Sequence, residues 1–199
     1  MNLLDINEWS ANQILNIFHL TDEIKLGMHK NGLTGKAFIL FFPESSIRTR
    51  ITFERGIKEL GGECILFPSE TLDKREQLSD VIKYIENWAQ AVIVRHPSFS
   101  KIQELCSHST IPVINAMTAV NHPCEILSDL YSISKRREQF QELVYTFIGP
   151  AGNICKSWVA IANVMNLKFN HVCTKGHELG DDTGNYKFYT FLDEIRSAL

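Results

Sequence analysis

The sequence alternates short apolar runs with longer amphipathic segments, and this alternation restricts the fold more than any other feature. Six runs have the length and composition of buried strands, at residues 36–42, 63–67, 91–95, 111–115, 144–149 and 168–173. Helical patterns lie beside them at residues 7–29, 47–60, 75–88, 98–107, 123–137 and 153–166. Strands that alternate with helices predict an α/β fold with a doubly wound parallel sheet.

The polar stretch SKRREQFQEL, at residues 134–143, separates the fourth and fifth predicted strands. We therefore predict a domain junction near residue 140, with a first domain over residues 1–140 and the start of a second, Rossmann-like α/β domain over residues 141–199. The alternative is one continuous sheet, which periodicity alone leaves open. A loop rich in turn-forming residues leads to YKFYTFLDEIRSAL at the end of the chain, which we expect to form a last helix.

Composition excludes several classes of protein. The hydrophobic share of 44% and the charged share of 22% are typical of a folded globular protein. The net charge of -3 provides no broad positive surface for nucleic acid or for an anionic membrane, so any anion site must be local. No apolar run reaches the ~18 residues that a membrane span needs, and the amino terminus does not resemble a secretory signal. We therefore predict a cytoplasmic protein.

Cysteine and histidine usage indicates neither a disulfide framework nor a structural metal. The five cysteines are odd in number and contain no C-x-x-C pair, so we expect reduced thiols. The seven histidines are scattered, and none has a second ligand at metal-binding spacing.

The stretch ESSIRTR crowds hydroxyl groups and arginines between the first strand and the following helix. Beyond the carboxyl end of a strand in an open α/β sheet, a helix presents free amide groups and the positive end of its dipole. Ser46 and Thr49 can donate hydroxyl hydrogen bonds there, and Arg48 can bind an oxyanion with two N–H groups. One interpretation is a phosphate site. The other is a capped helix with exposed arginines, in which Arg50 pairs with Glu54.

Two further polar signals follow strands. VIVRHP places Arg95 at the carboxyl end of the third strand, and NHPCEILSDLYSI places His122 just before a helix that opens with Pro123. A single histidine is more often packed or solvated than a ligand. Three polar signals at three strand ends of one sheet nevertheless favour a ligand site.

In this order and separation, SSIRTR, VRHP and HPCEILSDLYSI resemble the carbamoyl phosphate domain of the aspartate and ornithine carbamoyltransferases. The corresponding family patterns are S-T-R-T-R, an arginine before H-P, and H-P-x-Q, and the similarity runs from about residue 30 to about residue 175. The resemblance implies transfer of the carbamoyl group from carbamoyl phosphate to an amine, with no metal or organic cofactor.

The resemblance also implies a role for each matching residue. The phosphate would be held by Ser46, Ile47, Arg48 and Thr49. Arg95 would bridge the phosphate and the carbonyl oxygen, His122 would donate a hydrogen bond to that oxygen, and residue 125 would hold the carbamoyl amide. These groups would stabilise the negative charge that grows on oxygen when the amine attacks, and would neutralise the departing phosphate.

Two more roles follow from the resemblance. The family acts as a homotrimer in which a loop of the neighbouring subunit delivers a lysine, and ETLDKREQLSD resembles that loop, with Lys74 in the lysine's place. A solvated charged loop is the alternative. Asn153, in FIGPAGNICKSW, stands where ornithine-type members carry an asparagine and aspartate-type members an arginine. Ornithine or a related amine is thus the expected acceptor, with a plain helix cap at Asn153 as the alternative.

The sequence departs from the family at several points. Glu125 replaces a glutamine, and its negative charge would face a dianion, so we expect it to be protonated or paired, or the donor to differ from carbamoyl phosphate. Ile47 replaces a threonine but keeps the backbone amide. About 56 residues (144–199) follow the polar stretch, which is short for an independent domain, and the family's later acceptor-binding motifs are not found in them. We therefore predict a shortened carbamoyltransferase; the alternative is a non-catalytic carbamoyl phosphate-binding or oligomerising protein.

Overall fold

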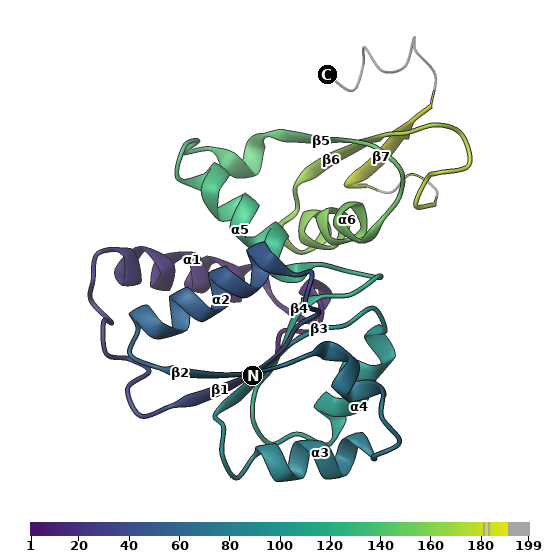
Figure 1. Cartoon of the computed structure of the whole chain (residues 1–199). Coiled ribbons are helices and arrows are strands. Elements are labelled where there is room, and N and C mark those ends of the chain that lie inside the picture. The colour runs from purple at the N-terminus through teal and green to yellow at the C-terminus, as the bar shows by residue number, and fades with distance from the viewer. Residues whose placement is uncertain (181, 183, 191–199) are drawn as a thin grey trace. The chain divides into compact units, whose positions relative to one another are not determined.

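The structure, a computed structural model, describes residues 1–180, 182 and 184–190 (Figure 1). The chain forms two compact units, one of Met1–Leu4 with Asn16–Ala119, the other of Asp5–Leu15 with Val120 onward. Each unit contains its own parallel sheet, which excludes the alternative of one continuous sheet. The predicted junction near residue 140 lies shortly before the first strand of the second sheet, and as a domain boundary it stays a prediction.

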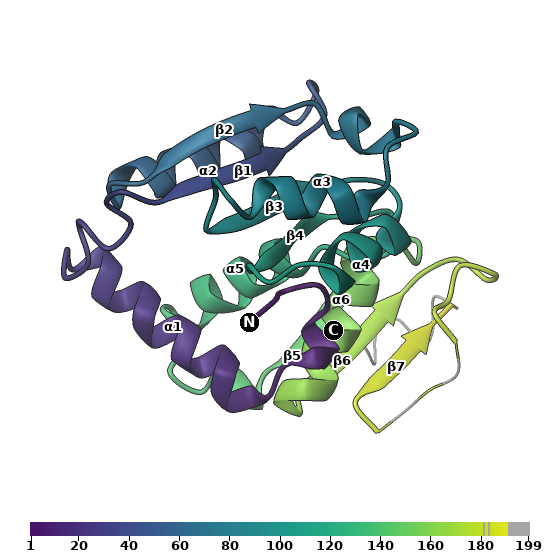
Figure 2. The same cartoon turned by 90° about the horizontal axis from the view of Figure 1, so that it is seen from below.

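The first unit is built on four parallel strands in the order β2-β1-β3-β4. These are β1 (Ala37–Phe41), β2 (Glu63–Phe67), β3 (Ala91–Arg95) and β4 (Val113–Met117). The chain goes from β1 outward to β2 and then crosses back to β3 on the other side of β1, so this sheet is doubly wound, as predicted. Figure 2 shows β2 at the outer edge of the sheet.

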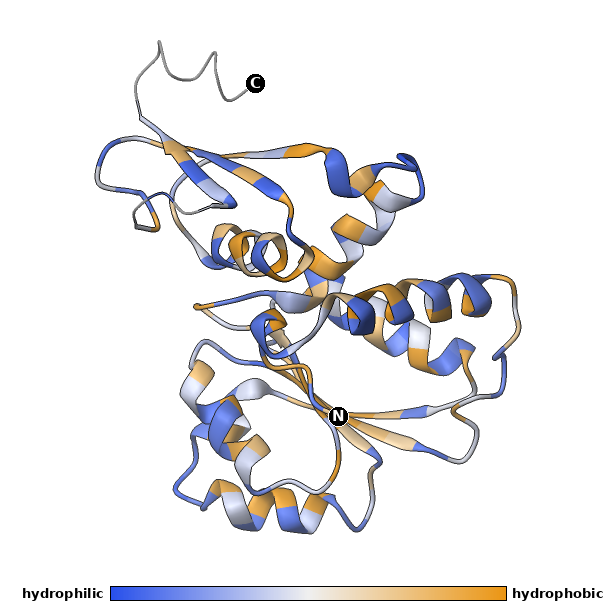
Figure 3. Cartoon of the chain, turned by 180° about the vertical axis from the view of Figure 1, so that it is seen from behind, coloured by the Kyte–Doolittle hydropathy of each residue, from blue (hydrophilic) through white to orange (hydrophobic). Residues whose placement is uncertain are grey.

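Helices cover both faces of this sheet. Helix α2 (Ile47–Glu59) lies on one face, and α3 (Leu78–Ile85) and α4 (Phe99–Ser107) lie on the other (Figure 1). Successive residues of a strand point to opposite faces, so Ile39 and Phe41 pack with α3 and α4 while Leu40 packs with Ile57 of α2. Figure 3 shows the apolar residues gathered along these strands.

The second unit has three parallel strands in the order β5-β6-β7, with β5 at Val144–Ile148, β6 at Lys168–Val172 and β7 at Tyr186–Tyr189. Helix α5 (Pro123–Ser134) precedes the sheet, and α6 (Asn153–Met165) connects β5 to β6. Strand β6 is buried at its centre, where His171 bonds to Gly149 O and to the Tyr186 hydroxyl at 2.7 and 3.1 Å.

The predicted last helix is wrong where the structure describes it. Residues Tyr186–Tyr189 form strand β7, parallel to β6, and residues 191–199 of that prediction lie outside the described residues. Aromatic side chains favour strands, and the buried Tyr186 stacks on Phe169 with ring centroids 6.2 Å apart. Cross-strand aromatic packing thus decides the conformation of Tyr186–Tyr189, where the sequence pattern had suggested a helix.

The other elements complete the connections. The predicted helix over residues 7–29 is two elements, a short 3-10 helix η1 (Ile6–Glu8) and α1 (Ala11–Lys25), with Ser10 and Gln13 forming a reciprocal cap at the start of α1. Two further 3-10 turns are η2 (Ser69–Asp73) and η3 (Phe140–Glu142). No helix within the described residues is long and apolar enough to cross a membrane.

Candidate active site

A cavity of about 220 Å³ lies at the carboxyl edge of the first sheet. Parallel strands all end at one edge, so residues that follow β1, β3 and β4 line this cavity together. The lining consists of Pro43, Arg95, His96, Pro97, Met117, Thr118 and Ala119. Its volume fits a ligand smaller than a drug-sized molecule.

Arg95 is the last residue of β3 and contributes the positive charge of this cavity. The four residues before it are buried, and the pairing with β4 shifts register between Val94 and Arg95. Nη1 of Arg95 donates a hydrogen bond to Oγ1 of Thr49 at 2.8 Å. The structure therefore brings together two of the predicted phosphate-binding residues, one from a strand end and one from the first turn of α2.

Ser46 is the N-cap residue of α2 but does not use its side chain as a cap. It is 4% exposed, and its Oγ atom has no hydrogen-bond partner among the described residues. A buried polar group left unsatisfied is destabilising by about 1–3 kcal/mol, so native proteins rarely retain one without a role. Ser46 lies at the N-terminus of α2, a helix of 13 residues, and such a position is suited to binding an anion.

The backbone amides at the start of α2 differ in availability. The Ile47 amide donates to the Ser45 carbonyl at 2.9 Å, so it takes part in the turn that precedes the helix. The amides of Arg48 and Thr49 belong to the first helical turn, where no preceding helical carbonyl can accept from them. These two amides, rather than that of Ile47, are the donors that α2 offers to a ligand.

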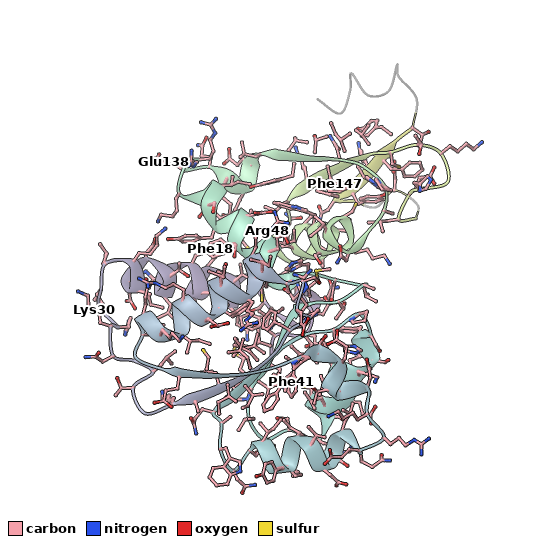
Figure 4. The ribbon with its side chains drawn as sticks, in the orientation of Figure 1. Phe18, Lys30, Phe41, Arg48, Glu138 and Phe147 are labelled. Carbon is pink, nitrogen blue, oxygen red and sulfur yellow. The ribbon has the colours of Figure 1, made fainter. Side chains whose placement is uncertain are left out.

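The two arginines beside Ser46 have different environments. Arg50 forms an ion pair with Glu54, with Nε and Oε1 2.7 Å apart, as the alternative interpretation of this segment predicted. Arg48 is exposed near the start of α2, and no described residue forms an ion pair with it (Figure 4). Arg48 is thus the arginine of this segment whose guanidinium can bind an anion.

A polar cluster that the sequence did not reveal anchors the turn before Lys74. Oδ1 of Asp73 accepts hydrogen bonds from His96 Nε2 at 3.1 Å and from Lys101 Nζ. Lys101 Nζ also donates to the Leu72 carbonyl at 3.0 Å. The hydrogen bond from Lys101, followed by that from His96, lowers the pKa of the Asp73 carboxyl. Lys74 itself follows η2 and is exposed.

The protonation of His96 follows from its contacts. Nδ1 of His96 accepts from the Ser98 amide at 3.0 Å, so the ring proton resides on Nε2 and is donated to Asp73. The ring is 4% exposed and joins the end of β3 to η2. The signal in the sequence was the histidine of VRHP, which we used only as part of the family pattern.

In the second unit the structure pairs His122 with Glu125. Nε2 of His122 lies 2.7 Å from Oε2 of Glu125, and the His122 backbone amide donates to Ser157 Oγ at 2.8 Å. Of the states that we expected for Glu125, the paired one is present. Asn153 is the first residue of α6, and the N-cap is Gly152, so a cap role does not describe Asn153.

The predicted site residues thus form local groups within each unit. Arg95 with Thr49 belongs to the first unit, and His122 with Glu125 belongs to the second. The convergence of Arg48, Arg95 and His122 on one small molecule stays a prediction. Among the described residues, no group of three or more histidine, cysteine, aspartate or glutamate side chains could hold a metal ion.

Comparison with known proteins identifies the family. The model described as "Aspartate/ornithine carbamoyltransferase, carbamoyl-P binding domain" matches residues 1–135. The ornithine carbamoyltransferase of Listeria innocua is 30% identical over 184 residues, which cover 90% of this chain and 58% of that protein. The chain spans about three fifths of the length of the curated relatives that it matches.

Solved structures show the same fold. The ornithine carbamoyltransferase from Burkholderia thailandensis matches with a TM-score of 0.89 and 23% identity, over 99% of this chain and 71% of that one. The catalytic subunit of M. Jannaschii aspartate transcarbamoylase matches with a TM-score of 0.80 and 28% identity, over 97% of this chain and 69% of that one. With the family model covering residues 1–135, the chain belongs to the aspartate/ornithine carbamoyltransferase family.

Proposed function

We propose that the protein is a carbamoyltransferase that moves the carbamoyl group of carbamoyl phosphate to the amine of ornithine or a related amino acid. The products are a citrulline-like ureido compound and phosphate. The observation that carries this proposal is the buried Ser46 hydroxyl, which has no partner among the described residues and lies at the start of α2. A phosphate oxygen at this helix end would satisfy it.

The charged groups of the first unit suit the donor. Arg48 and the free amides of the first turn of α2 would hold the phosphate, while Arg95 is fixed by Thr49 beside the cavity at the strand ends. As the C–O bond to phosphate breaks, its electron pair stays on the phosphate, and the negative charge that develops on the former bridging oxygen lies next to these guanidinium groups. Removal of one such donor from a reaction of this kind costs on the order of 3 kcal/mol in the activation barrier.

The residues of the second unit would act on the carbamoyl group and the acceptor. His122 would donate to the carbonyl oxygen, and Glu125 would accept from the carbamoyl amide. Asn153 is the first residue of α6 and stands where ornithine-type members of the family carry an asparagine, which supports a role in acceptor binding. An asparagine offers no positive charge to a side-chain carboxylate, so ornithine or a related amine is favoured over aspartate.

We further propose a homotrimer in which Lys74 of one subunit serves the site of another. An apolar groove of about 340 Å³ lies beside the turn that bears Lys74, and its lining includes Ile65, Phe67, Thr71, Glu76, Tyr84 and Trp88. Tyr84 and Trp88 are 69% and 62% exposed, and Ile65 and Phe67 belong to the edge strand β2. An exposed apolar surface next to a sheet edge favours burial by another chain.

A non-catalytic carbamoyl phosphate-binding or oligomerising protein is the second candidate. The observation that favours it is Glu125, which stands where the family pattern has a glutamine at the donor site. Both candidates share the donor site, and they differ in whether any amine is carbamoylated. The cytoplasmic location stays a prediction under either one.

Two measurements test the proposal. Carbamoyl phosphate at about 100 times its Kd should stabilise the protein by about 2.7 kcal/mol, which raises Tm by about 5–10 °C for a chain of this size. Ureido product is then measured with ornithine, acetylornithine, succinylornithine, putrescine and aspartate as acceptors.

The outcomes separate the candidates. Product with ornithine or a related amine supports the transferase, and a thermal shift without product from any acceptor supports the non-catalytic candidate. No thermal shift at millimolar carbamoyl phosphate would contradict both. Carbamoyl-aspartate as the product would reject the role of Asn153.

A further inference from the structure

The pair of His122 and Glu125 occupies the start of α5, where the family pattern has a histidine and a glutamine. His122 is the N-cap residue of α5 and Glu125 is the third residue of the helix, and Nε2 of His122 lies 2.7 Å from Oε2 of Glu125. The histidine side chain is 8% exposed, whereas the glutamate side chain is 49% exposed. The ring is therefore shielded from water, while the carboxylate that contacts it is partly hydrated.

The contact determines which ring nitrogen carries a proton. An ionised carboxylate only accepts hydrogen bonds, so Nε2 of His122 is the donor. A carboxylate in contact with an imidazole favours the protonated ring, whereas burial and the positive end of the α5 dipole favour the neutral ring. An imidazolium with a carboxylate has no net charge, and neither has a neutral histidine with a glutamine. If the ring is protonated, glutamate in place of glutamine therefore leaves the net charge of the two residues at zero, and the ring of His122 carries one more proton.

The other titratable groups on α5 do not replace Glu125 in this role. Burial raises the pKa of the Cys124 thiol to about 12, so this neighbour is uncharged at neutral pH. Burial and then the negative charge of Glu125 raise the pKa of the Asp129 carboxyl, which lies one turn further along the helix. The charge of Glu125 therefore acts on Asp129 from a distance, whereas the ring of His122 is in direct contact with the Glu125 carboxylate.

The elements packed against the start of α5 carry charges of both signs. Lys156 of α6 and Asp5 line one cavity with Asn121 and Pro123, the residues on either side of His122. Burial and then the charge of Asp5 raise the pKa of the Glu8 carboxyl in η1. Lys156 and Asp5 carry charges of opposite sign, and the carboxylate in direct contact with the ring of His122 is that of Glu125.

We propose that Glu125 is a positioning residue that fixes the ring of His122 through Nε2 and keeps this ring protonated at neutral pH. The role in catalysis rests on the proposed function, in which His122 donates to the carbonyl oxygen of the donor. An imidazolium has two N–H groups, so Nδ1 can donate to that oxygen while Nε2 stays with Glu125. A charged donor forms a stronger hydrogen bond to an oxygen that gains negative charge as the amine attacks.

The second oxygen of Glu125 gives the pair a further use. While Oε2 accepts from His122, Oε1 can accept from the carbamoyl amide, which is the role that the family pattern assigns to residue 125. The protonated ring also offsets the charge that Glu125 would otherwise bring toward the phosphate dianion. One glutamate thus performs the amide contact and supplies a charged partner for the neighbouring histidine.

An NMR titration of the histidine side chains in the full chain tests this inference without requiring turnover. The His122 signal is identified by its absence from the His122→Gln protein. We expect the His122 pKa to lie above ~6.5, the usual value for histidine. Glu125→Gln keeps a hydrogen-bond acceptor and removes the charge, so it should lower the His122 pKa by about one unit, a tenfold loss of proton affinity.

Two other variants serve as controls. Asp129→Asn removes one negative charge from the next turn of α5 and should move the His122 pKa by less than a third as much. Glu125→Asp keeps the charge but shortens the side chain, so it should give an intermediate value. If Glu125→Gln does not fold, the two other variants are compared. The inference is supported if Glu125→Asp lowers the His122 pKa more than Asp129→Asn does, and it is overturned if Glu125→Asp does not.

The inference is overturned if the ring of His122 titrates alike in the wild-type and Glu125→Gln proteins, or if Asp129→Asn has an equal effect. Failure of the ureido assay would instead refute the proposed function. The two failures are distinguishable because the titration reports the state of the ring in either case.

Discussion

Ser46 shows at the level of one residue how binding and stability oppose each other. Its hydroxyl is buried, makes no cap bond to α2 and has no other partner among the described residues. Functional sites often retain such unfavourable groups because a ligand satisfies them. The same hydroxyl should therefore lower the stability of the free protein and strengthen the binding of an anion.

Ser46→Ala separates these two effects. We expect the free energy of unfolding to rise by about 1 kcal/mol, because the unsatisfied group is removed and no cap bond is lost. The affinity for carbamoyl phosphate should fall about tenfold, as for the loss of one hydrogen bond to a charged ligand. Urea denaturation and ligand titration measure the two quantities. Ser45→Ala, at an exposed neighbour, is the control, and a less stable Ser46→Ala protein would contradict the argument.

The sequence predicted the residue types of the candidate site better than their contacts. The pair of Arg50 and Glu54 is four residues apart on one helix, so helical spacing was enough to suggest it. The hydrogen bond from Arg95 to Thr49 joins residues 46 apart, and that from His96 to Asp73 joins residues 23 apart. Such contacts depend on how strands and helices pack, which periodicity does not specify.

At the level of elements, the strands of the first sheet were the most predictable. The edge strand β2 and the buried strand β3 both have the predicted bounds, because the apolar run of β2 stops at Pro68 and that of β3 stops at Arg95. Strand β4 begins two residues later than predicted, at Val113, directly after Pro112, which has no N–H for strand pairing. Strand β7 was missed because four residues are too few to show a period, and its pairing with β6 decides its conformation.

The turn η2 is an element whose stability should depend on pH. The hydrogen bond from Lys101, and then that from His96, lowers the pKa of the Asp73 carboxyl below its usual 3.8. A lowered pKa means that the contribution of Asp73 is fully present above about pH 4 and is lost as the pH falls through the folded-state pKa. Because Asp73 is 49% exposed, this contribution should stay below about 1 kcal/mol.

Asp73→Asn tests this element. Urea denaturation should show a deficit in unfolding free energy that is constant between pH 5 and 7 and shrinks below pH 4. Hydrogen exchange of amides in residues 69–74 should be faster in the variant, because the link from η2 to His96 and Lys101 is weakened. Glu104→Gln, at an exposed position of α4 outside the groove, should change neither quantity. A deficit that grows at acid pH would be inconsistent with the sign of the pKa change.

At the level of the whole molecule, the apolar groove beside β2 and α3 is a surface that a single folded chain would leave exposed to water. Tyr84 and Trp88 lie with ring centroids 6.4 Å apart and are both largely exposed. Aromatic residues in such a setting dominate the binding energy of protein interfaces. The groove also adjoins the turn of Lys74, so one contact between copies would bury the groove and carry that turn to a neighbouring subunit.

Trp88→Glu should therefore convert the proposed trimer into single chains. A carboxylate at this position loses the burial of a large aromatic ring, worth about 2–3 kcal/mol or more per contact, and would be costly to bury unpaired. Light scattering coupled to gel filtration should give about three times the chain mass of 22.7 kDa for the wild type and about that mass for the variant.

Leu26→Glu alters an apolar residue that is 79% exposed and lies outside the groove, so it should leave the mass of the assembly unchanged. A wild-type protein with the mass of one chain would refute the trimer, and a Trp88→Glu protein that still assembles would place the interface elsewhere.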